Sequence, residues 1–183
     1  QEALRRWEAE HDPLTGLLNR RGFERRLEEA LADFIKTGMS SALILFDLDN
    51  FKPVNDEGGH ALGDELLRRV AQVVARETRG SDHLGRQGGD EFGLLLPSCT
   101  HEHARRIAVS IRDAIARGSV SRGDKAYFVT ASIGVTHFRE GDDSIASVLA
   151  RADAASYEAK HQGRNAVVVH RDHAGRPADS GVL

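Results

Sequence analysis

The sequence predicts an α+β fold in which an antiparallel central sheet is flanked by helices. Short apolar runs typical of strands alternate with longer segments whose apolar residues recur at helical spacing. Between residues 41 and 135 the expected elements follow the order β-α-β-β-α-β, which is the order of the ferredoxin-like split unit. Gly88-Gly89 lies between two strand-like runs and predicts a tight hairpin, because glycine reaches positive φ without a Cβ penalty.

Composition limits the class of protein. With 183 residues and 40% hydrophobic content, the chain can build one domain with extensions. Its net charge of −3 disfavours nucleic acid as a partner, since nucleic-acid-binding domains are normally basic. The single cysteine, Cys99, cannot form an internal disulfide, which fits a reducing, cytoplasmic location. No apolar run approaches the ~20 residues that a membrane-spanning helix requires.

The N-terminal residues 1–10 are expected to form a helix that is too short to be stable alone, with Leu4 and Trp7 on one side. It is either the end of a longer linker helix from an upstream sensory module or a frayed terminus. Residues 11–20 read as a loop, and Asn19 is a good N-cap for the helix that follows. That helix ends at Gly38, and its expected inward residues are Phe23, Leu27, Ala30, Leu31, Phe34 and Ile35.

Residues 41–48 predict a central strand that is buried on both faces and ends in Asp47-Leu48-Asp49. A tight polar segment, residues 50–56, follows it. The next helix is expected from about His60 to Thr78, with Asp64 in its first turn, where the helix dipole favours a carboxylate. Its expected core stripe is Leu62, Leu66, Val70, Val73 and Val74.

The second half of the chain repeats this alternation. A turn at residues 79–82 leads into a strand at 83–87, and after the hairpin a second strand runs to Leu96, where Pro97 ends it. A helix over 101–117 and a strand over 127–135 follow. Ser144 is expected to cap a last helix through His161, followed by a strand at 166–169 and a loose tail at 171–183. The inward residues expected in the two helices are Ala104, Ile107, Ala108, Ile111 and Ile115, and then Ile145, Val148, Leu149, Ala152 and Tyr157.

Four carboxylates are expected at one edge of the sheet. Asp47 and Asp49 end the first strand, which lies beside the hairpin that carries Asp90 and Glu91. A carboxylate at the end of a buried strand is costly unless it binds something or reaches water. Asp47 and Asp90 could share one or two Mg²⁺ ions, which prefer oxygen ligands and stabilise attacking and leaving oxygens in nucleotidyl transfer. A solvated acidic turn is the alternative.

Neighbouring residues could bind the phosphates of a nucleotide. The backbone N–H groups of Asn50 and Phe51 and the ammonium of Lys52 directly follow the first carboxylates. Lys160 and Arg164 could add positive charge, although each alone also fits a solvated cation near a helix C-terminus.

Asn55 and Asp64 could together read a base edge. A carboxylate accepts naturally from the ring N–H and the exocyclic amino group of guanine. Asp64 by itself also fits an ordinary carboxylate at a helix start.

These residues occur in motifs that resemble those of the GGDEF family of bacterial diguanylate cyclases. The resemblance covers about residues 11–170, with motifs in family-like order and spacing. The motifs are Asp12-x-Leu14-Thr15-Gly16-Leu17-x-Asn19-Arg20; residues 46–56 with Gly59-His60 and Gly63-Asp64; Gly88-Gly89-Asp90-Glu91-Phe92; Ser132-Ile133-Gly134-Val135; and Ala152-Asp153, Tyr157, Ala159-Lys160 and Gly163-Arg164-Asn165.

The resemblance implies a reaction in which two GTP condense to cyclic di-GMP and release two pyrophosphates. Each domain of a homodimer would hold one GTP, and Mg²⁺ or Mn²⁺ would be the cofactor. By matching position, Asp47, the Leu48 carbonyl and Asp90 would hold the metal, and Glu91 would assist at the metal or at the attacking hydroxyl. The implied substrate-binding residues are Asn50, Phe51, Lys52, Asn55, Asp64, Gly88, Gly89, Lys160 and Arg164.

Arg79-x-x-Asp82 lies where the family carries an inhibitory site for its product. The resemblance implies that Arg79 and Asp82 bind cyclic di-GMP and restrain turnover. An R-x-x-D string alone is also common as a weak surface ion pair.

Two departures from the family pattern, Gln87 and Ser156, fall on no proposed ligand. A catalytically silent domain that binds GTP or cyclic di-GMP as a sensor is the alternative function. Degenerate members of the family usually lose signature residues, and this sequence keeps them.

Overall fold

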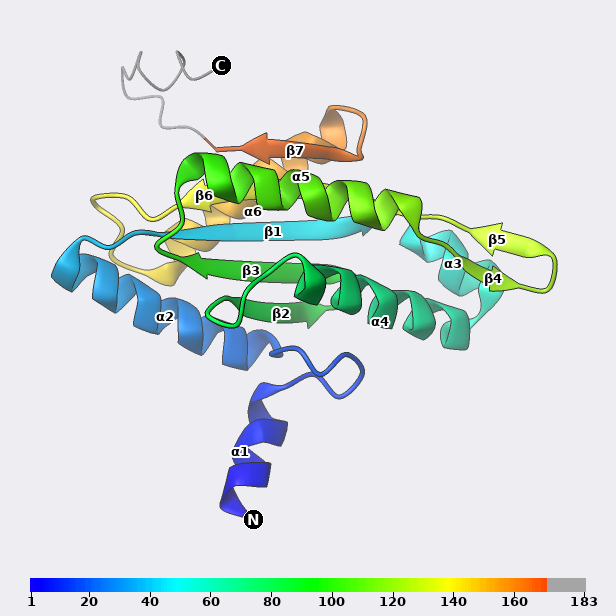
Figure 1. Cartoon of the computed structure of the whole chain (residues 1–183), viewed down its shortest axis with the longest axis horizontal. Helices are drawn as coiled ribbons and strands as arrows, with labels where there is room; N and C mark the ends of the chain where they lie inside the picture. Colours follow the sequence, from blue (N-terminus) through cyan, green and yellow to red (C-terminus); the bar gives the residue numbers. More distant parts are fainter. Residues whose placement is uncertain (171–183) are drawn as a thin grey trace.

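The computed structural model describes residues 1–170, and the loose tail expected at 171–183 lies outside the described residues. The helices and strands alternate as Figure 1 shows. Their bounds are α1 Glu2–Glu10, α2 Arg20–Thr37, β1 Ser41–Asp49, α3 Phe51–Gly58, α4 His60–Arg76, β2 His83–Gly88, β3 Glu91–Pro97, α5 His101–Arg117, β4 Val120–Arg122, β5 Lys125–Tyr127, β6 Thr130–His137, α6 Ile145–His161 and β7 Ala166–Val169.

The main sheet has five strands in the order β2-β3-β1-β6-β7. β1 pairs antiparallel with both β3 and β6, and β2 pairs antiparallel with β3, so the predicted ferredoxin-like order is confirmed. The sheet is nevertheless mixed, because β7 pairs parallel with β6. The physical reason is that α6 forms a crossover between these two strands, which returns the chain in the same direction.

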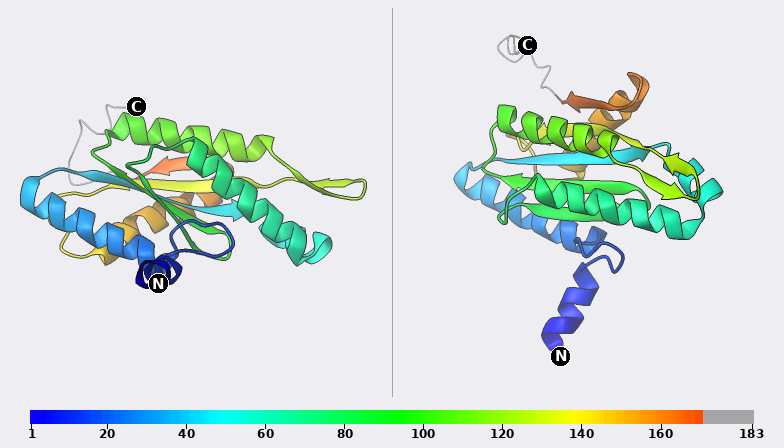
Figure 2. Two further views of the ribbon diagram at one scale, coloured as in Figure 1. Left: turned by 60° about the horizontal axis from the view of Figure 1, so that its bottom comes forward. Right: turned by 45° about the vertical axis from the view of Figure 1, so that its right-hand side comes forward.

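Helices cover both faces of the sheet, as the left view of Figure 2 shows. α2 and α6 pack on one face, and α4 and α5 pack on the other. From β1, Ile44 and Phe46 enter the core beneath α4 and α5, whereas Leu43 enters the core beneath α2 and α6. The prediction of a central strand buried on both faces is therefore confirmed, and its C-terminal end carries Asp47 to the edge of the fold.

Residues 51–58 form the helix α3, where the sequence predicted only a tight polar segment. Pro53 lies in the first turn of α3, where a missing N–H breaks no helical hydrogen bond. Because α4 begins at His60, Asp64 lies beyond the first turn of that helix, and the prediction that it occupies the first turn is wrong.

The hairpin of β4 and β5 was not predicted. Its strands have three residues each, too few to show an alternating pattern. Tyr127 belongs to β5, so the strand expected over 127–135 begins instead at Thr130.

Two predictions about helix packing are wrong. Tyr157 and Ile35 are each 64% exposed and do not pack inward. α6 instead approaches the sheet through alanines, and at Gly134 of β6 a Cβ would lie 2.3 Å from the Ala152 carbonyl oxygen. Close approach thus leaves no room for a large inward residue on this face of α6. Ser144 does occupy the N-cap position of α6, but its side chain makes no capping hydrogen bond.

α1 projects away from the body of the domain and buries none of its residues (Figures 1 and 2). Its C-terminal residue, Glu10, holds it to α2 through ion pairs with Arg25 at 2.5 Å and Arg26 at 3.4 Å. Across residues 1–170, none of the helices combines the length and the apolar character that crossing a membrane requires.

Candidate active site

The end of β1 and the tip of the β2–β3 hairpin meet at one edge of the sheet. The strand register places Asp47 opposite Glu91 on β3 and opposite Ser132 on β6. The Leu48 N–H donates to the Asp90 carbonyl oxygen at 3.3 Å. The structure therefore brings Asp47, Leu48, Asp90 and Glu91 together from segments more than 40 residues apart in sequence.

Negative charge is concentrated at this edge. Burial raises the pKa of Asp90 above its ordinary value, and the neighbouring negative charge of Asp47 raises this pKa further. The pKa of Glu91 is also raised, first by burial and then by Asp47, although the Arg20 guanidinium 4.0 Å away opposes this shift. The ionised carboxylates thus repel one another, and a bound cation would relieve that repulsion.

One cation of the protein already lies in this cluster. The Lys160 ammonium, from the last turn of α6, donates to Asp47 at 2.6 Å. This hydrogen bond raises the pKa of Lys160, and the charge of Asp47 adds to it. Lys160 therefore remains protonated and compensates Asp47 in the ligand-free protein.

Asp49 lies two residues from Asp47 but has a different environment. It is 3% exposed and accepts hydrogen bonds from the hydroxyls of Thr130 and Ser132 and from the Asn165 N–H, at 2.6, 2.7 and 3.0 Å. Asp49 therefore fastens β6 and the segment after α6 to the end of β1. Sequence reasoning missed this network, although the alternating hydroxyls of Thr130 and Ser132 were a usable signal.

The oxygen ligands that Asp47, Asp90 and the Leu48 carbonyl could offer fit a hard cation such as Mg²⁺. Over residues 1–170, no three His, Cys, Asp or Glu side chains are grouped closely enough to hold a metal by themselves. Mg²⁺ is usually bound by one or two carboxylates, with substrate phosphates and waters completing the shell. Asp47 and Asp90 match the one or two carboxylates that the protein usually supplies, and the Leu48 carbonyl lies adjacent to them.

The segment expected to hold phosphates begins α3. Asn50 adopts the left-handed conformation, with φ of +64°, and makes no side-chain hydrogen bond to the start of the helix. The N–H groups of Phe51 and Lys52 follow directly, and the first N–H groups of a helix lack intrahelical partners and attract anions. Lys52 is highly exposed and pairs with Asp56 at 2.6 Å, while Arg164 is exposed beyond α6.

The two expected base-reading residues come from adjacent helices. Asn55 lies on α3 and Asp64 on α4, and the corner between these helices brings them together. A Cβ at Gly63 would lie 2.0 Å from Asn55 Oδ1, so only glycine at 63 lets the Asn55 side chain lie against α4.

The turn of the β2–β3 hairpin is exposed, and its two glycines leave the backbone uncovered by side chains. Gly88 and Gly89 are exposed and have φ of +147° and +50°, conformations that other residues rarely adopt. Arg86 donates to the Gly89 carbonyl oxygen at 2.8 Å and to Asp12 at 2.9 Å. Sequence reasoning did not select Arg86, which ties the turn to the loop after α1.

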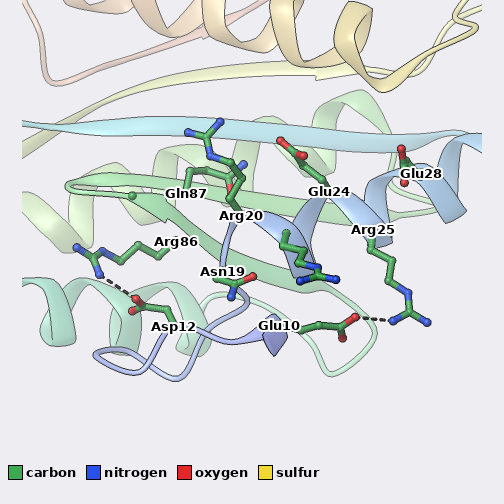
Figure 3. A pocket seen from close by; sticks show the side chains of 11 residues that line it. Glu10, Asp12, Asn19, Arg20, Glu24, Arg25, Glu28, Arg86 and Gln87 are labelled. Atoms are coloured by element: carbon green, nitrogen blue, oxygen red, sulfur yellow. Dashed lines mark hydrogen bonds and ion pairs between the residues drawn. The ribbon is translucent and has the colours of Figure 1, made fainter. Parts of the chain in front are cut away.

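Asp12 and Arg86 border a pocket of about 840 Å³ behind the hairpin (Figure 3). Their side chains are only 13% and 16% exposed. Asp12 also accepts the N–H and hydroxyl of Thr15, so its carboxylate is well satisfied. This ion pair fixes the position of the hairpin relative to the N-terminal segment.

Arg79 and Asp82, the residues expected at an inhibitory site, line a pocket that contains none of the carboxylates of the acidic edge. Asp82 is 8% exposed and accepts the Arg79 N–H at 2.9 Å. Its other oxygen, Oδ1, is buried and has no hydrogen-bond partner within residues 1–170. The two residues line a pocket of about 270 Å³ together with Arg76, Glu77, Thr78, His103 and Ile107.

Comparison with known proteins gives a consistent result. The family described as "Diguanylate cyclase, GGDEF domain" matches residues 9–166. The chain is 43% identical over 164 residues to the probable diguanylate cyclase DgcE of Escherichia coli, covering 90% of this chain and 15% of that protein. It is 41% identical over 160 residues to E. coli diguanylate cyclase DgcM, covering 87% and 38%. The chain thus spans less than half the length of these relatives.

Solved structures share the fold. The coiled coil and GGDEF domain of DgcB from Caulobacter crescentus, in complex with c-di-GMP, matches with a TM-score of 0.86 at 33% identity, covering 92% of this chain and 88% of that one. Diguanylate cyclase SiaD from Pseudomonas aeruginosa, in complex with its activator SiaC, matches with a TM-score of 0.85 at 39% identity, covering 92% and 64%.

Proposed function

This chain belongs to the GGDEF diguanylate cyclase family, and from that membership we propose that it condenses two GTP into cyclic di-GMP and two pyrophosphates. The observation that carries the proposal is the acidic edge, where Asp47, Asp90 and Glu91 meet beside an open glycine turn. A silent sensor domain is disfavoured because every signature residue is retained.

The reaction requires two domains. The 3′-OH of each GTP attacks the α-phosphate of the other, so that two phosphodiester bonds form and two bonds to pyrophosphate break. Each attacking hydroxyl loses a proton. Because one domain holds one GTP, two copies of the domain face each other during turnover. Asp47, the Leu48 carbonyl and Asp90 would hold Mg²⁺ or Mn²⁺, which would neutralise charge on the phosphates.

The other residues bind and orient the nucleotide. The start of α3, at Asn50, Phe51 and Lys52, accepts the phosphates, with Lys160 and Arg164 as added cations. Gly88 and Gly89 let the nucleotide approach the backbone, and Asn55 with Asp64 reads the guanine edge. Glu91 assists at the metal or at the attacking hydroxyl.

Dimerisation is supported by α1. Leu4 and Trp7 are 59% and 47% exposed and lie one helical turn apart. A second copy of the same helix would cover them, as the coiled coil of DgcB illustrates for a relative. We propose that α1 continues a helix from an upstream sensory module and that the domain works in the cytoplasm.

Product inhibition is supported by the Arg79–Asp82 pocket. Arg79 lines this pocket, and its guanidinium can bind a phosphate of the product. The c-di-GMP bound to DgcB is consistent with a product site in this fold.

The experiment is to incubate the purified chain with GTP and Mg²⁺ and to separate the products by chromatography. We expect cyclic di-GMP and pyrophosphate from the unmodified chain and neither from Asp90→Ala or Glu91→Ala. Asp113→Ala is the matched control, because Asp113 lies on the remote helix α5. GTP binding without product at high protein concentration would contradict cyclase activity and support the sensor function.

A further inference from the structure

We propose that the β4–β5 hairpin holds α3 in place and that Arg122 is a positioning residue for guanine recognition. This inference rests on the proposed function, because it concerns the placement of Asn55 in the nucleotide site. In Figure 1 the hairpin extends beyond the sheet and lies beside α3.

α3 has few anchors of its own. It contains eight residues, and a helix of this length is unstable without tertiary support. Only Val54 and Gly58 are buried, and no side chain caps its N-terminus. Phe51 and Val54 pack against the core cluster near the start and middle of α3, and contacts at its C-terminal end are needed to fix the other end of the helix.

Arg122 supplies those contacts. One guanidinium nitrogen, Nη1, donates to the carbonyl oxygens of Gly58 at 3.1 Å and Glu57 at 3.4 Å. The last carbonyls of a helix lack intrahelical partners and favour a nearby cation. Lys125 adds a 2.7 Å ion pair with the Glu57 side chain. The two cations of the hairpin thus hold the C-terminal turn of α3 from outside.

The base of the hairpin is fixed to the domain core. Val120 and Val129 are 1% and 2% exposed and belong to the core cluster beneath α4 and α5. Arg69 of α4 donates to the Ser119 carbonyl oxygen at 2.9 Å. Because the base of the hairpin is fixed to the core, the hairpin can hold α3 at a fixed position relative to the core.

The restrained turn is the one that carries Asn55. The Asn55 carbonyl accepts the Gly59 N–H at 3.0 Å, and the Asn55 side chain lies against Gly63 of α4. A shift of α3 would therefore move Asn55 relative to Asp64. Two base-reading groups must keep a fixed separation to bind one guanine edge, since a small misplacement breaks both hydrogen bonds.

The test measures nucleotide binding separately from turnover. The probe is 3′-deoxy-GTP, which lacks the attacking hydroxyl, titrated by calorimetry in Mg²⁺; 3′-deoxy-ITP, which lacks the exocyclic amino group, is the comparison. We expect Arg122→Ala to weaken 3′-deoxy-GTP binding about tenfold, since loss of a hydrogen bond to a charged group costs on that scale. Discrimination against 3′-deoxy-ITP should fall, and Arg122→Lys should restore part of both.

Two further variants control for general effects. Arg117→Ala removes an exposed arginine at the end of α5 and should leave binding unchanged. Lys125→Ala removes the ion pair with Glu57 and a cation–π contact with Tyr127, and it should weaken 3′-deoxy-GTP binding about twofold. In turnover assays Arg122→Ala should raise KM while kcat at saturating GTP stays within about twofold.

Unchanged affinity in Arg122→Ala, or equal loss for both nucleotides, would overturn the proposal. A fall in kcat without a change in KM would also overturn it. If the unmodified chain binds 3′-deoxy-GTP but makes no cyclic di-GMP, the cyclase proposal fails while the role of Arg122 is still decided by binding. If the unmodified chain binds neither nucleotide, both proposals fail.

Discussion

Lys160 donates a 2.6 Å hydrogen bond to Asp47 across 113 residues of sequence. The pair joins the last turn of α6 to the end of β1, and both side chains are partly buried, at 35% and 23% exposure. An ammonium thus lies against the carboxylate that we propose as a metal ligand. A metal bound there would compete with Lys160 for Asp47 until nucleotide phosphates offered Lys160 another anion.

Lys160→Met should tighten Mg²⁺ binding in the absence of nucleotide and lower turnover. Removing the ammonium frees Asp47 from a pair worth about 1 kcal/mol, so Mg²⁺ should bind about fivefold more tightly. Turnover should fall because the phosphates lose a cation. Mg²⁺-dependent melting temperatures and cyclic di-GMP assays measure the two effects. Weaker Mg²⁺ binding in the variant would contradict the competition.

Asp90→Asn should abolish product formation while stabilising the metal-free domain. Burial and Asp47 raise the pKa of Asp90, so ionising this carboxyl costs more free energy in the folded state than in the unfolded state. The amide has the same shape without the charge. We expect the melting temperature in EDTA to rise by a few degrees. Asp113→Asn, at a side chain of α5 that is 47% exposed and pairs with Arg112, is the control and should change little.

Arg86→Lys should slow turnover although the charge is kept. The guanidinium of Arg86 donates to the Gly89 carbonyl oxygen through Nε and to Asp12 through Nη1. The single ammonium of lysine cannot reproduce this pair of hydrogen bonds. The hairpin should lose its fixed position, and we expect about a tenfold lower kcat. Arg105→Lys, at an exposed pair with Glu102, is the matched control. Equal kcat values for Arg86→Lys and Arg105→Lys would show that the two hydrogen bonds of Arg86 do not affect catalysis.

Arg79→Ala should remove product inhibition without reducing the initial rate. The residue lines the pocket that Asp82 also lines and that contains none of the carboxylates of the acidic edge. Progress curves should stay linear as cyclic di-GMP accumulates, whereas those of the unmodified chain should bend. Calorimetry with added cyclic di-GMP gives a direct check. Retained inhibition in the variant would place the product elsewhere.

Stability should fall as pH decreases from about 6.5 to about 4, partly because of His137. Burial, and after it the charge of neighbouring His101, lowers the pKa of His137 to about 4. The unfolded state therefore binds a proton first, so folding loses up to about 3 kcal/mol over this range. Urea unfolding at several pH values measures the effect.

The matched variant for this pH effect is His137→Gln. The ring Nε2 of His137 lies 2.8 Å from the Cys99 carbonyl oxygen, and glutamine can keep that hydrogen bond without titrating. The slope of stability against pH should be shallower in this variant. An unchanged slope would assign the acid sensitivity to other groups.

The meeting of Asp47, Asp90 and Glu91 at one edge could be predicted from sequence, because it follows from the order of the elements and from glycine at a turn. The roles of the other site residues rest on the family resemblance and stay predictions. The register then places Asp47 opposite Glu91, as the β-α-β-β-α-β order requires. The Arg86–Asp12 pair could not be predicted in this way, since its partners lie 74 residues apart. Neither could the exposure of Tyr157, because the close approach of α6 to Gly134 depends on backbone packing.

The sequence by itself determined the order of the elements, the hairpin and the family motifs, because these depend on local periodicity and on the φ freedom of glycine. Only the tertiary structure distinguished Asp47 from Asp49, which look alike in the sequence. Asp49 is saturated by donors 81 to 116 residues away, whereas Asp47 has one exchangeable cation as its partner. The environment of a carboxylate is set by donors that only chain folding brings within reach.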